Sequence, residues 1–450
     1  MFDKVLVANR GEVAVRIVRA LRELDVKSVV VYSDADRNTL AVRLADESVC
    51  IGPTPSAQSY LSIPAIIGAA TSRGVQAIHP GYGFLAENAT FARACADSGV
   101  VFIGPTPEAI EMMGDKNTAR ETMKRIGVPT VPGSDGVITT VEEAVRFAEQ
   151  VGYPVLIKAS AGGGGKGMRV VESIEQMEGA FVAARTEAGA AFANDAVYLE
   201  KYLLHPRHIE IQVLADSQGN ALHLCERDCS IQRRHQKLLE EAPSPAVTFD
   251  LRKRMGEAAL KAVREVSYLG AGTIEFLLDG EGSFYFMEMN TRVQVEHPVT
   301  EAITGTDLIK EQVRIAAGEP ISVLDRVPLE PNGHAIEFRI NAEDPHNNFW
   351  PSPGTITALS LPGGPGVRMD THIFAGYTVP PNYDSLIAKL IVWGSSRAEA
   401  MARGRRALDE LVIEGIKTTT PFHRSVLDER DFIAGEAHTD YILTHEDALS

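Results

Sequence analysis

Short apolar runs alternate with amphipathic stretches through the first third of the chain. Residues 5–8 form a continuous apolar run, which predicts a buried strand, and residues 12–23 carry apolar side chains at helical spacing. Further strands are predicted at 28–32, 77–79 and 100–103. Strands that alternate with helices in this way predict a parallel sheet with helices on both faces.

The pattern changes after residue 104. One helix is predicted over 107–126, and proline-containing breaks then place a boundary near Gly133. Two short strands, 153–158 and 168–171, flank a glycine-rich loop and predict a hairpin. Beyond about residue 204, polar and apolar positions alternate, most clearly at 208–213 and across 284–296, which predicts a strand-rich part.

Composition restricts the class of protein. The 450 residues include 44 Lys and Arg against 60 Asp and Glu, a net charge of −16. This acidic excess argues against nucleic acid as the main partner, because phosphate backbones attract basic surfaces. Charged residues make up 23% and hydrophobic residues 44%, which are ordinary globular values and exclude a disordered chain.

Cysteine usage and the N-terminus predict the compartment. Four cysteines (Cys50, Cys95, Cys225 and Cys229) are too few for a disulfide framework, so a reducing cytosol is expected. No apolar stretch reaches the roughly 18 residues that span a bilayer, and the N-terminus lacks the features of a signal peptide. We therefore expect a soluble cytoplasmic protein with no membrane partner.

The loop at 161–167 contains four consecutive glycines, Lys166 and a further glycine. Glycines let backbone N–H groups approach a phosphate closely, so the loop is a candidate phosphate lid at the mobile tip of its hairpin. It is not a Walker P-loop, because Gly167 rather than Ser or Thr follows the lysine. The alternative is a flexible linker, although linkers commonly mix glycine with serine.

Residues 288–296 place a polar side chain at every second position. If the segment is extended, Glu288, Asn290, Arg292, Gln294 and Glu296 share one face. Carboxylate and amide oxygens suit Mg²⁺. A lone acid in the predicted strand 273–277, Glu275, would need a partner, and a shared magnesium site with Glu288 would supply one. The alternative is a structural network of salt bridges.

A basic run at 227–237 is a local exception in an acidic chain. An anionic substrate would explain it, whereas the alternative is an ordinary solvated basic face. Within or near it lie His223, Cys225, Cys229 and His235, which could be considered as zinc ligands. Their spacing fits no usual zinc pattern, so zinc is disfavoured.

Two strand ends near the N-terminus could carry a ligand. The turn at Gly11 is similar to the entry of a Rossmann domain but lacks the full glycine fingerprint, which supports an NAD-dependent enzyme only weakly. Residues 79–83 with Glu87 follow another strand end, where α/β sheets place ligands. They could equally form a plain turn.

Together these segments resemble the biotin carboxylase component of the biotin-dependent carboxylases, which have the ATP-grasp fold. The resemblance covers essentially the whole chain, and its most specific parts are residues 7–12, 79–88, 113–116, the glycine loop, 226–237 and 288–298. It implies an α/β, in part α+β, architecture with an N-terminal Rossmann-like domain, a lid domain, a catalytic core and a C-terminal mixed α/β domain. The boundaries expected are 1–113, 114–203, 204–332 and 333–450.

The resemblance also implies roles for individual residues. Those expected at ATP are Lys116 and Lys158 on the phosphates, Gly164 and Gly165 in the lid, Glu200, Lys201 and Leu203 at adenine, and His208, Gln232 and His235 beside the nucleotide. The metal ligands expected are Glu275, Glu288 and Asn290. Those expected at bicarbonate are Lys237, Arg292, Gln294 and Val295, with Glu296 as the base and Arg339 stabilising the biotin enolate. Lys166 stands where the family often has arginine, which we expect to tune affinity.

The implied reaction uses ATP, Mg²⁺ or Mn²⁺ and bicarbonate to carboxylate biotin on a carrier protein. No Ala-Met-Lys-Met tetrapeptide occurs in the chain, so the biotin carboxyl carrier protein and the carboxyltransferase are expected to be separate polypeptides. The commonest such arrangement is acetyl-CoA carboxylase in fatty acid synthesis, and a homodimer is expected. A pyruvate, propionyl-CoA or 2-oxoglutarate carboxylase stays open, as does a non-catalytic ATP-binding regulatory subunit.

Overall fold

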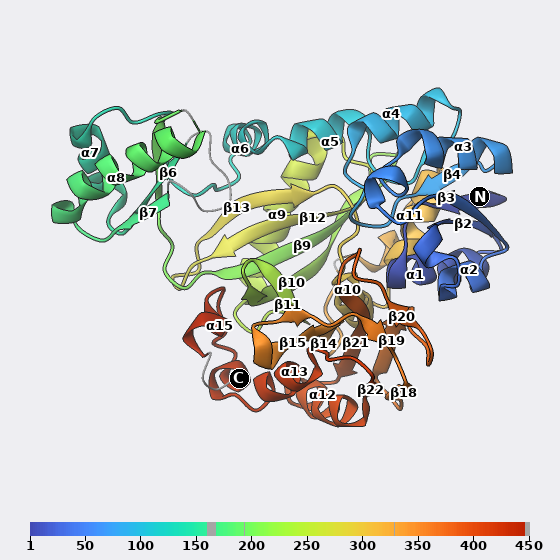
Figure 1. Ribbon diagram of the computed structural model, residues 1–450. Helices are drawn as coiled ribbons and strands as arrows, with labels where there is room; N and C mark the ends of the chain where they lie inside the picture. The colour runs from blue at the N-terminus through green and yellow to red at the C-terminus, as the bar shows by residue number, and fades with distance from the viewer. Residues whose placement is uncertain (160–167, 193, 328, 446–450) are drawn as a thin grey trace. The chain divides into compact units, whose positions relative to one another are not determined.

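The computed structural model describes residues 1–159, 168–192, 194–327 and 329–445 (Figure 1). The predicted phosphate lid, including Gly164, Gly165 and Lys166, lies outside these described residues. The chain forms two compact units. Unit 1 comprises Met1–Val128, Arg207–Phe276 and Glu288–Ser450, and unit 2 comprises Pro129–Pro206 and Leu277–Met287.

Unit 1 begins with a five-stranded parallel sheet of order β3-β2-β1-β4-β5, which confirms the predicted strands. Its strands are β1 (Lys4–Val7), β2 (Lys27–Ser33), β3 (Glu47–Gly52), β4 (Ala77–His79) and β5 (Val101–Phe102). Val5 and Val7 join one hydrophobic cluster with α1 (Gly11–Glu23), whereas Leu6 joins another with α3 (Ile63–Arg73) and α4 (Ala89–Asp97). Both faces of the sheet are therefore covered, as the alternation of strands and helices predicts.

The single helix predicted over 107–126 is wrong, because two helices occupy it: α5 (Pro107–Gly114) and α6 (Lys116–Arg125). Asp115 between them has an extended backbone, and its Oδ1 accepts the N–H of Thr118 at 2.8 Å. An aspartate side chain at such a position caps the second helix and interrupts the first. The remaining helix of this region is α2 (Leu40–Leu44).

An eight-stranded sheet of order β13-β12-β9-β10-β11-β14-β21-β19 follows. Its strands are β9 (Arg207–Ala215), β10 (Ala221–Arg233), β11 (Gln236–Ala242), β12 (Gly270–Leu278), β13 (Phe284–Asn290), β14 (His334–Asn341), β19 (Val367–Thr371) and β21 (Leu386–Gly394). The helices here are α9 (Phe249–Glu265), α10 (His297–Thr304), α11 (Leu308–Ala316), α12 (Arg397–Glu410), α13 (Thr420–Val426), α14 (Arg430–Ala434) and α15 (Tyr441–Thr444). Short strands pair in separate two-stranded sheets, β15 with β16, β17 with β20 and β18 with β22: β15 (Glu343–Asp344), β16 (Trp350–Pro351), β17 (Gly354–Thr355), β18 (Ala358–Ser360), β20 (Thr378–Val379) and β22 (Val412–Glu414).

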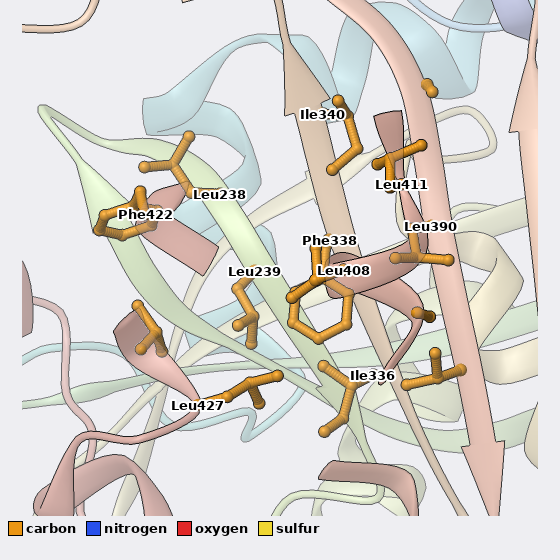
Figure 2. Packing of buried hydrophobic residues seen from close by; sticks show 14 of the residues in the cluster. Leu238, Leu239, Ile336, Phe338, Ile340, Leu390, Leu408, Leu411, Phe422 and Leu427 are labelled. Carbon is orange, nitrogen blue, oxygen red and sulfur yellow. The ribbon is translucent and has the colours of Figure 1, made fainter. Parts of the chain in front are cut away.

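Strand β14 separates an apolar core from a charged face. Its side chains Ile336, Phe338 and Ile340 are buried among apolar residues of β11, β21 and α12 (Figure 2). Because successive side chains of a strand point to opposite faces, Glu337 and Arg339 lie on the other face. The same alternation on β21 places Leu390 and Val392 in this core and the buried Lys389 on the other face.

Unit 2 is a small sheet covered by helices. The three strands have the order β7-β6-β8 and are antiparallel: β6 (Val155–Ala159), β7 (Met168–Val171) and β8 (Val197–Lys201). The pairing of β6 with β7 confirms the predicted hairpin. Two helices, α7 (Val141–Val151) and α8 (Ile174–Phe192), cover the sheet, and Ile157, Leu199 and Phe181 lie in the core between them.

Among the described residues, no helix combines the length and the apolar character that crossing a bilayer requires.

Candidate active site

Lys237, the second residue of strand β11, lies at the centre of a buried group of carboxylates in unit 1. Its Nζ donates to Glu275 Oε1 and to Glu296 Oε1 at 2.9 Å each, and it also contacts Glu210 Oε1. Burial alone would lower the pKa of Lys237, but the three carboxylates outweigh it and hold the pKa well above its usual range. Lys237 is therefore a permanent cation at a site with little water.

Arg227 is a second buried cation of the same site. Its guanidinium donates to Glu210 Oε2 at 3.0 Å and to Gln294 Oε1 at 2.5 Å. Its other acceptors are Gln212, Thr273 and Thr300. Arg227 and Lys237 are not a solvated basic face, so that interpretation of the run 227–237 is wrong for both residues.

Glu275 on β12 joins the predicted metal strand to the predicted bicarbonate residues. Its Oε1 accepts from Asn290 Nδ2 at 2.7 Å and from Gln294 Nε2 at 2.6 Å, while His208 Nε2 lies 2.9 Å from its Oε2. Burial would raise the pKa of Glu275, but Lys237 and His208 outweigh it and hold the pKa well below its usual range. Glu275 is thus an anion at neutral pH.

Of the three residues predicted beside the nucleotide, His208 and Gln232 lie together. Gln232 Nε2 is 2.7 Å from His208 Nδ1 and donates to the Cys229 carbonyl at 2.8 Å. His235 is exposed in the turn between β10 and β11, where its φ is +65°. Among the described residues, the one potential metal-ligating group with a cysteine pairs Cys229 with two glutamates, so the four zinc candidates are not gathered.

Glu296 is held between two cations. Its Oε1 accepts from Lys237 at 2.9 Å, and its Oε2 accepts from Arg339 Nη2 at 3.0 Å. Burial would raise the pKa of Glu296, but Lys237 and Arg339 outweigh it and hold the pKa well below its usual range. Arg339 Nε also donates to Glu240 Oε1 at 2.5 Å. Burial raises the pKa of Glu240 to about 7, although Arg339 acts against it.

The predicted metal ligands lie on two strands. Glu288 and Asn290 share a face of β13, and Asn290 bonds to Glu275 on β12. Glu288 is half-buried, with Lys116 Nζ 3.6 Å from its Oε2. Two carboxylates and an amide oxygen form a hard donor set of the kind that Mg²⁺ binds, and Glu288 is open enough to accept a ligand.

The extended face predicted across 288–296 is wrong beyond Asn290. Strand β13 ends there, and residues 291–296 form turns that lead into α10, where Glu296 precedes the first helical residue. Val293 is buried in the core beside α1, which pulls the chain out of the sheet. The turns nevertheless bring Gln294 and Glu296 to Lys237.

Arg292 lies apart from this centre. It donates from Nε to Glu87 Oε2 at 2.9 Å and from Nη2 to Asn290 Oδ1 at 2.8 Å. Glu87 also accepts the backbone N–H of Thr291 at 3.0 Å. The segment with Glu87 is therefore not merely a plain turn, because it fixes the start of the turns at 291–296.

The sequence-predicted ATP residues of unit 2 lie on its small sheet. Lys158 on β6 forms an ion pair with Glu200 on the neighbouring strand β8. Lys201 Nζ donates to the carbonyls of Gly152 and Tyr153 at 2.9 and 3.1 Å, and Leu203 follows the end of β8 half-buried.

Sequence reasoning missed Glu210 and Glu240, and it placed Arg227 in the basic run without a role of its own. The signal for Glu210 was present, because it is a charged residue inside the alternating stretch 208–213 that forms a buried strand. A fully buried charge on a strand requires a partner, and here the partners come from distant strands. No local pattern identifies which charge pairs with which.

Comparisons with family models, with known sequences and with solved structures point to the same family. Family models match residues 1–110 (biotin carboxylase, N-terminal domain), 115–324 (carbamoyl-phosphate synthase L chain, ATP binding domain) and 337–444 (biotin carboxylase C-terminal domain). A biotin carboxylase of Nostoc sp. is 59% identical over 98% of both chains. The biotin carboxylase domain dimer of the Hydrogenobacter thermophilus 2-oxoglutarate carboxylase, in complex with MgADP, ADP and bicarbonate, superposes with a TM-score of 0.88 at 49% identity, covering 100% and 99% of the two chains. The biotin carboxylase subunit of a pyruvate carboxylase gives 0.92 at 49% identity with the same coverage.

Proposed function

The chain belongs to the biotin carboxylase family, and we propose that it uses ATP and bicarbonate to carboxylate the biotin of a separate carrier protein. It is an ATP-dependent carboxylase of the ATP-grasp class. The observation that carries the proposal is the placement of Glu296 as a buried anion between Lys237 and Arg339. A carboxylate so placed can take a proton from an anionic substrate that binds to the same cations.

In the first stage, a bicarbonate oxygen attacks the γ-phosphorus of ATP, and the bond to ADP breaks to give carboxyphosphate. Lys237, Arg292, Gln294 and Val295 are proposed to bind bicarbonate, and Glu296 to accept its proton. Paired with its cations, Glu296 is a weak base, because its pKa lies well below normal as Lys237 and Arg339 outweigh burial. Bicarbonate that takes over Lys237 would weaken this pairing and make Glu296 more basic.

The residues proposed to bind the nucleotide are those that the family resemblance implies. Lys116 and Lys158 are assigned to its phosphates, Gly164 and Gly165 to a cover over them, Glu200, Lys201 and Leu203 to adenine, and His208, Gln232 and His235 to its flanks. Glu275, Glu288 and Asn290 are assigned to Mg²⁺ or Mn²⁺. When bound, this ion supplies neutralisation of phosphate charge, which is a main requirement of phosphoryl transfer.

In the second stage, the ureido nitrogen of biotin forms a bond to the carboxyl carbon of carboxyphosphate, phosphate leaves, and the ureido proton departs with it. Arg339 is assigned to the negative charge that develops on the ureido oxygen. Its guanidinium is fixed by Glu240 and Glu296 at 2.5 and 3.0 Å, so it needs little reorganisation at the moment of reaction.

The carboxyl acceptor beyond biotin is proposed to be acetyl-CoA, with a biotin carboxyl carrier protein and carboxyltransferase subunits as partners. Solved relatives come from pyruvate and 2-oxoglutarate carboxylases, so those acceptors, with propionyl-CoA, are the alternatives. One of these relatives is a dimer, which supports a homodimer here. A cytoplasmic location is proposed from the four free cysteines. A regulatory subunit without catalysis is disfavoured, because Glu275, Glu288, Asn290, Arg292, Glu296 and Arg339 are all present.

Release of ADP tests the proposed function. The purified chain with Mg²⁺ and ATP should release ADP slowly when bicarbonate is present, and free biotin should accelerate the release. Omitting bicarbonate or Mg²⁺ should abolish it. Full ADP release without bicarbonate would contradict the proposal.

A further inference from the structure

A buried lysine outside the predicted site contacts it through the backbone. Lys389 on β21 is fully buried, and its Nζ donates to the carbonyl oxygen of Val295 at 2.8 Å. The same Nζ lies 3.3 Å from Glu12 Oε1, on α1. Burying an ion pair is costly, and an apolar side chain would commonly be as stable there. The lysine therefore calls for an explanation other than stability.

Lys389 fixes one of two successive peptide groups in the segment 294–296, which we name the bicarbonate turn. The carbonyl of Gln294 lies 2.7 Å from His297 Nδ1, and Lys389 holds the next carbonyl, that of Val295. Burial, together with Lys389 and Arg16, holds the pKa of His297 well below its usual range, so the ring is neutral. A carbonyl only accepts, so Nδ1 carries the proton and donates.

These two contacts determine where the backbone N–H groups point. In a planar trans peptide the N–H is directed opposite to the carbonyl. Holding the Gln294 carbonyl therefore orients the N–H of Val295, and holding the Val295 carbonyl orients the N–H of Glu296. Val295 has no polar side chain, so it can serve an anion only through its N–H.

We propose that Lys389 is a positioning residue for the reaction, acting through the Val295 carbonyl to hold the bicarbonate turn in the geometry that binds bicarbonate. The inference rests on the proposed function, since it assigns the turn to bicarbonate. Burial would lower the pKa of Lys389, but the carboxylates near it, Glu12 first and Asp370 among the others, outweigh burial and raise the pKa, so Lys389 stays charged inside the protein. Neither Lys389 nor Glu12 contacts the substrate.

The test compares a double variant with its matched control. Lys389→Met alone would leave Glu12 as an unpaired buried charge and could unfold the chain, so it is combined with Glu12→Gln. Glu12→Gln by itself keeps the bond from Lys389 to Val295, and Asp370, which also raises the pKa of Lys389, remains near it, so this variant is the control. Losing a charged hydrogen bond that orders the turn should raise the KM for bicarbonate about tenfold in the double variant. The KM for ATP should stay within about twofold, and Glu12→Gln should keep a bicarbonate KM near that of the parent.

Hydrogen exchange separates this inference from the proposed function. In the double variant, backbone amides of 294–297 should exchange faster than in Glu12→Gln, whether or not the chain turns over. Equal exchange and equal bicarbonate KM in the two variants would overturn the role of Lys389. A rise in the KM for ATP as large as the rise in the KM for bicarbonate would overturn it as well. If the parent released ADP without bicarbonate, the proposed function would fail, and the exchange of the turn would still decide whether Lys389 holds it.

Discussion

Arg339 and Glu296 form a direct ion pair, in which Nη2 of Arg339 donates to Oε2 of Glu296 over 3.0 Å. The proposed roles place these residues in different stages, the base in carboxyphosphate formation and the guanidinium in transfer to biotin. The pair links the two stages, because Arg339 also lowers the pKa of the base. A substitution of either residue should therefore change the rates of both stages, to different extents.

Replacing Arg339 should affect biotin carboxylation more than ATP cleavage. In Arg339→Ala, carboxybiotin formation should fall by about 10²–10³, the usual cost of losing a donor to a developing oxyanion. Bicarbonate-dependent ADP release without biotin should persist, since Lys237 still faces Glu296. ADP release and fixation of labelled bicarbonate are measured side by side.

Arg292→Ala is the matched comparison, because Arg292 is assigned to bicarbonate itself. It should reduce both activities together. Equal losses of both activities in Arg339→Ala would mean that Arg339 supports the ATP-dependent stage or the fold, and the division between the stages would be withdrawn.

Removing the half-buried carboxylate of Glu288 on β13 should weaken metal binding. Glu288→Gln should raise the Mg²⁺ concentration needed for half-maximal ADP release and lower the rate, since one of two anionic ligands is lost. Glu281→Gln, an exposed residue just before β13, is the control and should behave like the parent. An unchanged Mg²⁺ titration in Glu288→Gln would contradict the metal assignment.

Removing Arg227, a fully buried cation of the site, should destabilise the fold. Arg227→Met takes one cation away from Glu210, which still contacts Lys237, and removes the donor from several buried acceptors, which commonly costs about 3–5 kcal/mol. Urea unfolding measures the loss. Adding Glu210→Gln to Arg227→Met should recover part of the lost stability, because it removes the excess negative charge. A loss below about 1 kcal/mol in Arg227→Met alone would show that the network is not needed for stability.

The carboxyl that holds Arg339 predicts a pH dependence. Burial raises the pKa of Glu240 from 4.5 to about 7, although Arg339 opposes it. Between these values the folded state binds more protons than the unfolded state, so this group's contribution to stability falls as the pH rises through the window. The variant Glu240→Gln has no carboxyl group to titrate at this position, so its stability does not fall with pH for this reason.

The Tm of Glu240→Gln relative to the parent should therefore increase from about pH 5 to about pH 8. Thermal unfolding of both proteins at the two pH values checks it. A constant Tm difference would mean that Glu240 has an ordinary pKa in the fold.

The first sheet could be predicted because local signals determined it. The strand beginning at Lys4 is a short apolar run beside an amphipathic helix, and both the strand and its parallel pairing follow from that pattern. The break at Asp115 was missed, because apolar spacing continues through it while the side-chain cap ends the helix. The spacing of apolar residues alone does not reveal a side-chain cap.

The candidate site was predicted in its residue types but not in its connections. The face from Glu288 to Asn290 follows from strand alternation, whereas the turns at 291–296 are imposed by burial of Val293 in a core built by α1. Arg227 was predicted only as part of the basic run, without its partners, for a similar reason. Its acceptors, such as Gln294, lie far along the chain, and only the folded sheet brings them together.

Transfer of labelled bicarbonate to biotin tests the central claim most directly. The purified chain is incubated with ATP, Mg²⁺, labelled bicarbonate and free biotin, and carboxybiotin is measured together with ADP. The account predicts carboxybiotin and biotin-stimulated ADP in equal amounts, both abolished in Glu296→Gln. ADP that accumulates with no label on biotin, or label that persists in Glu296→Gln, would contradict it.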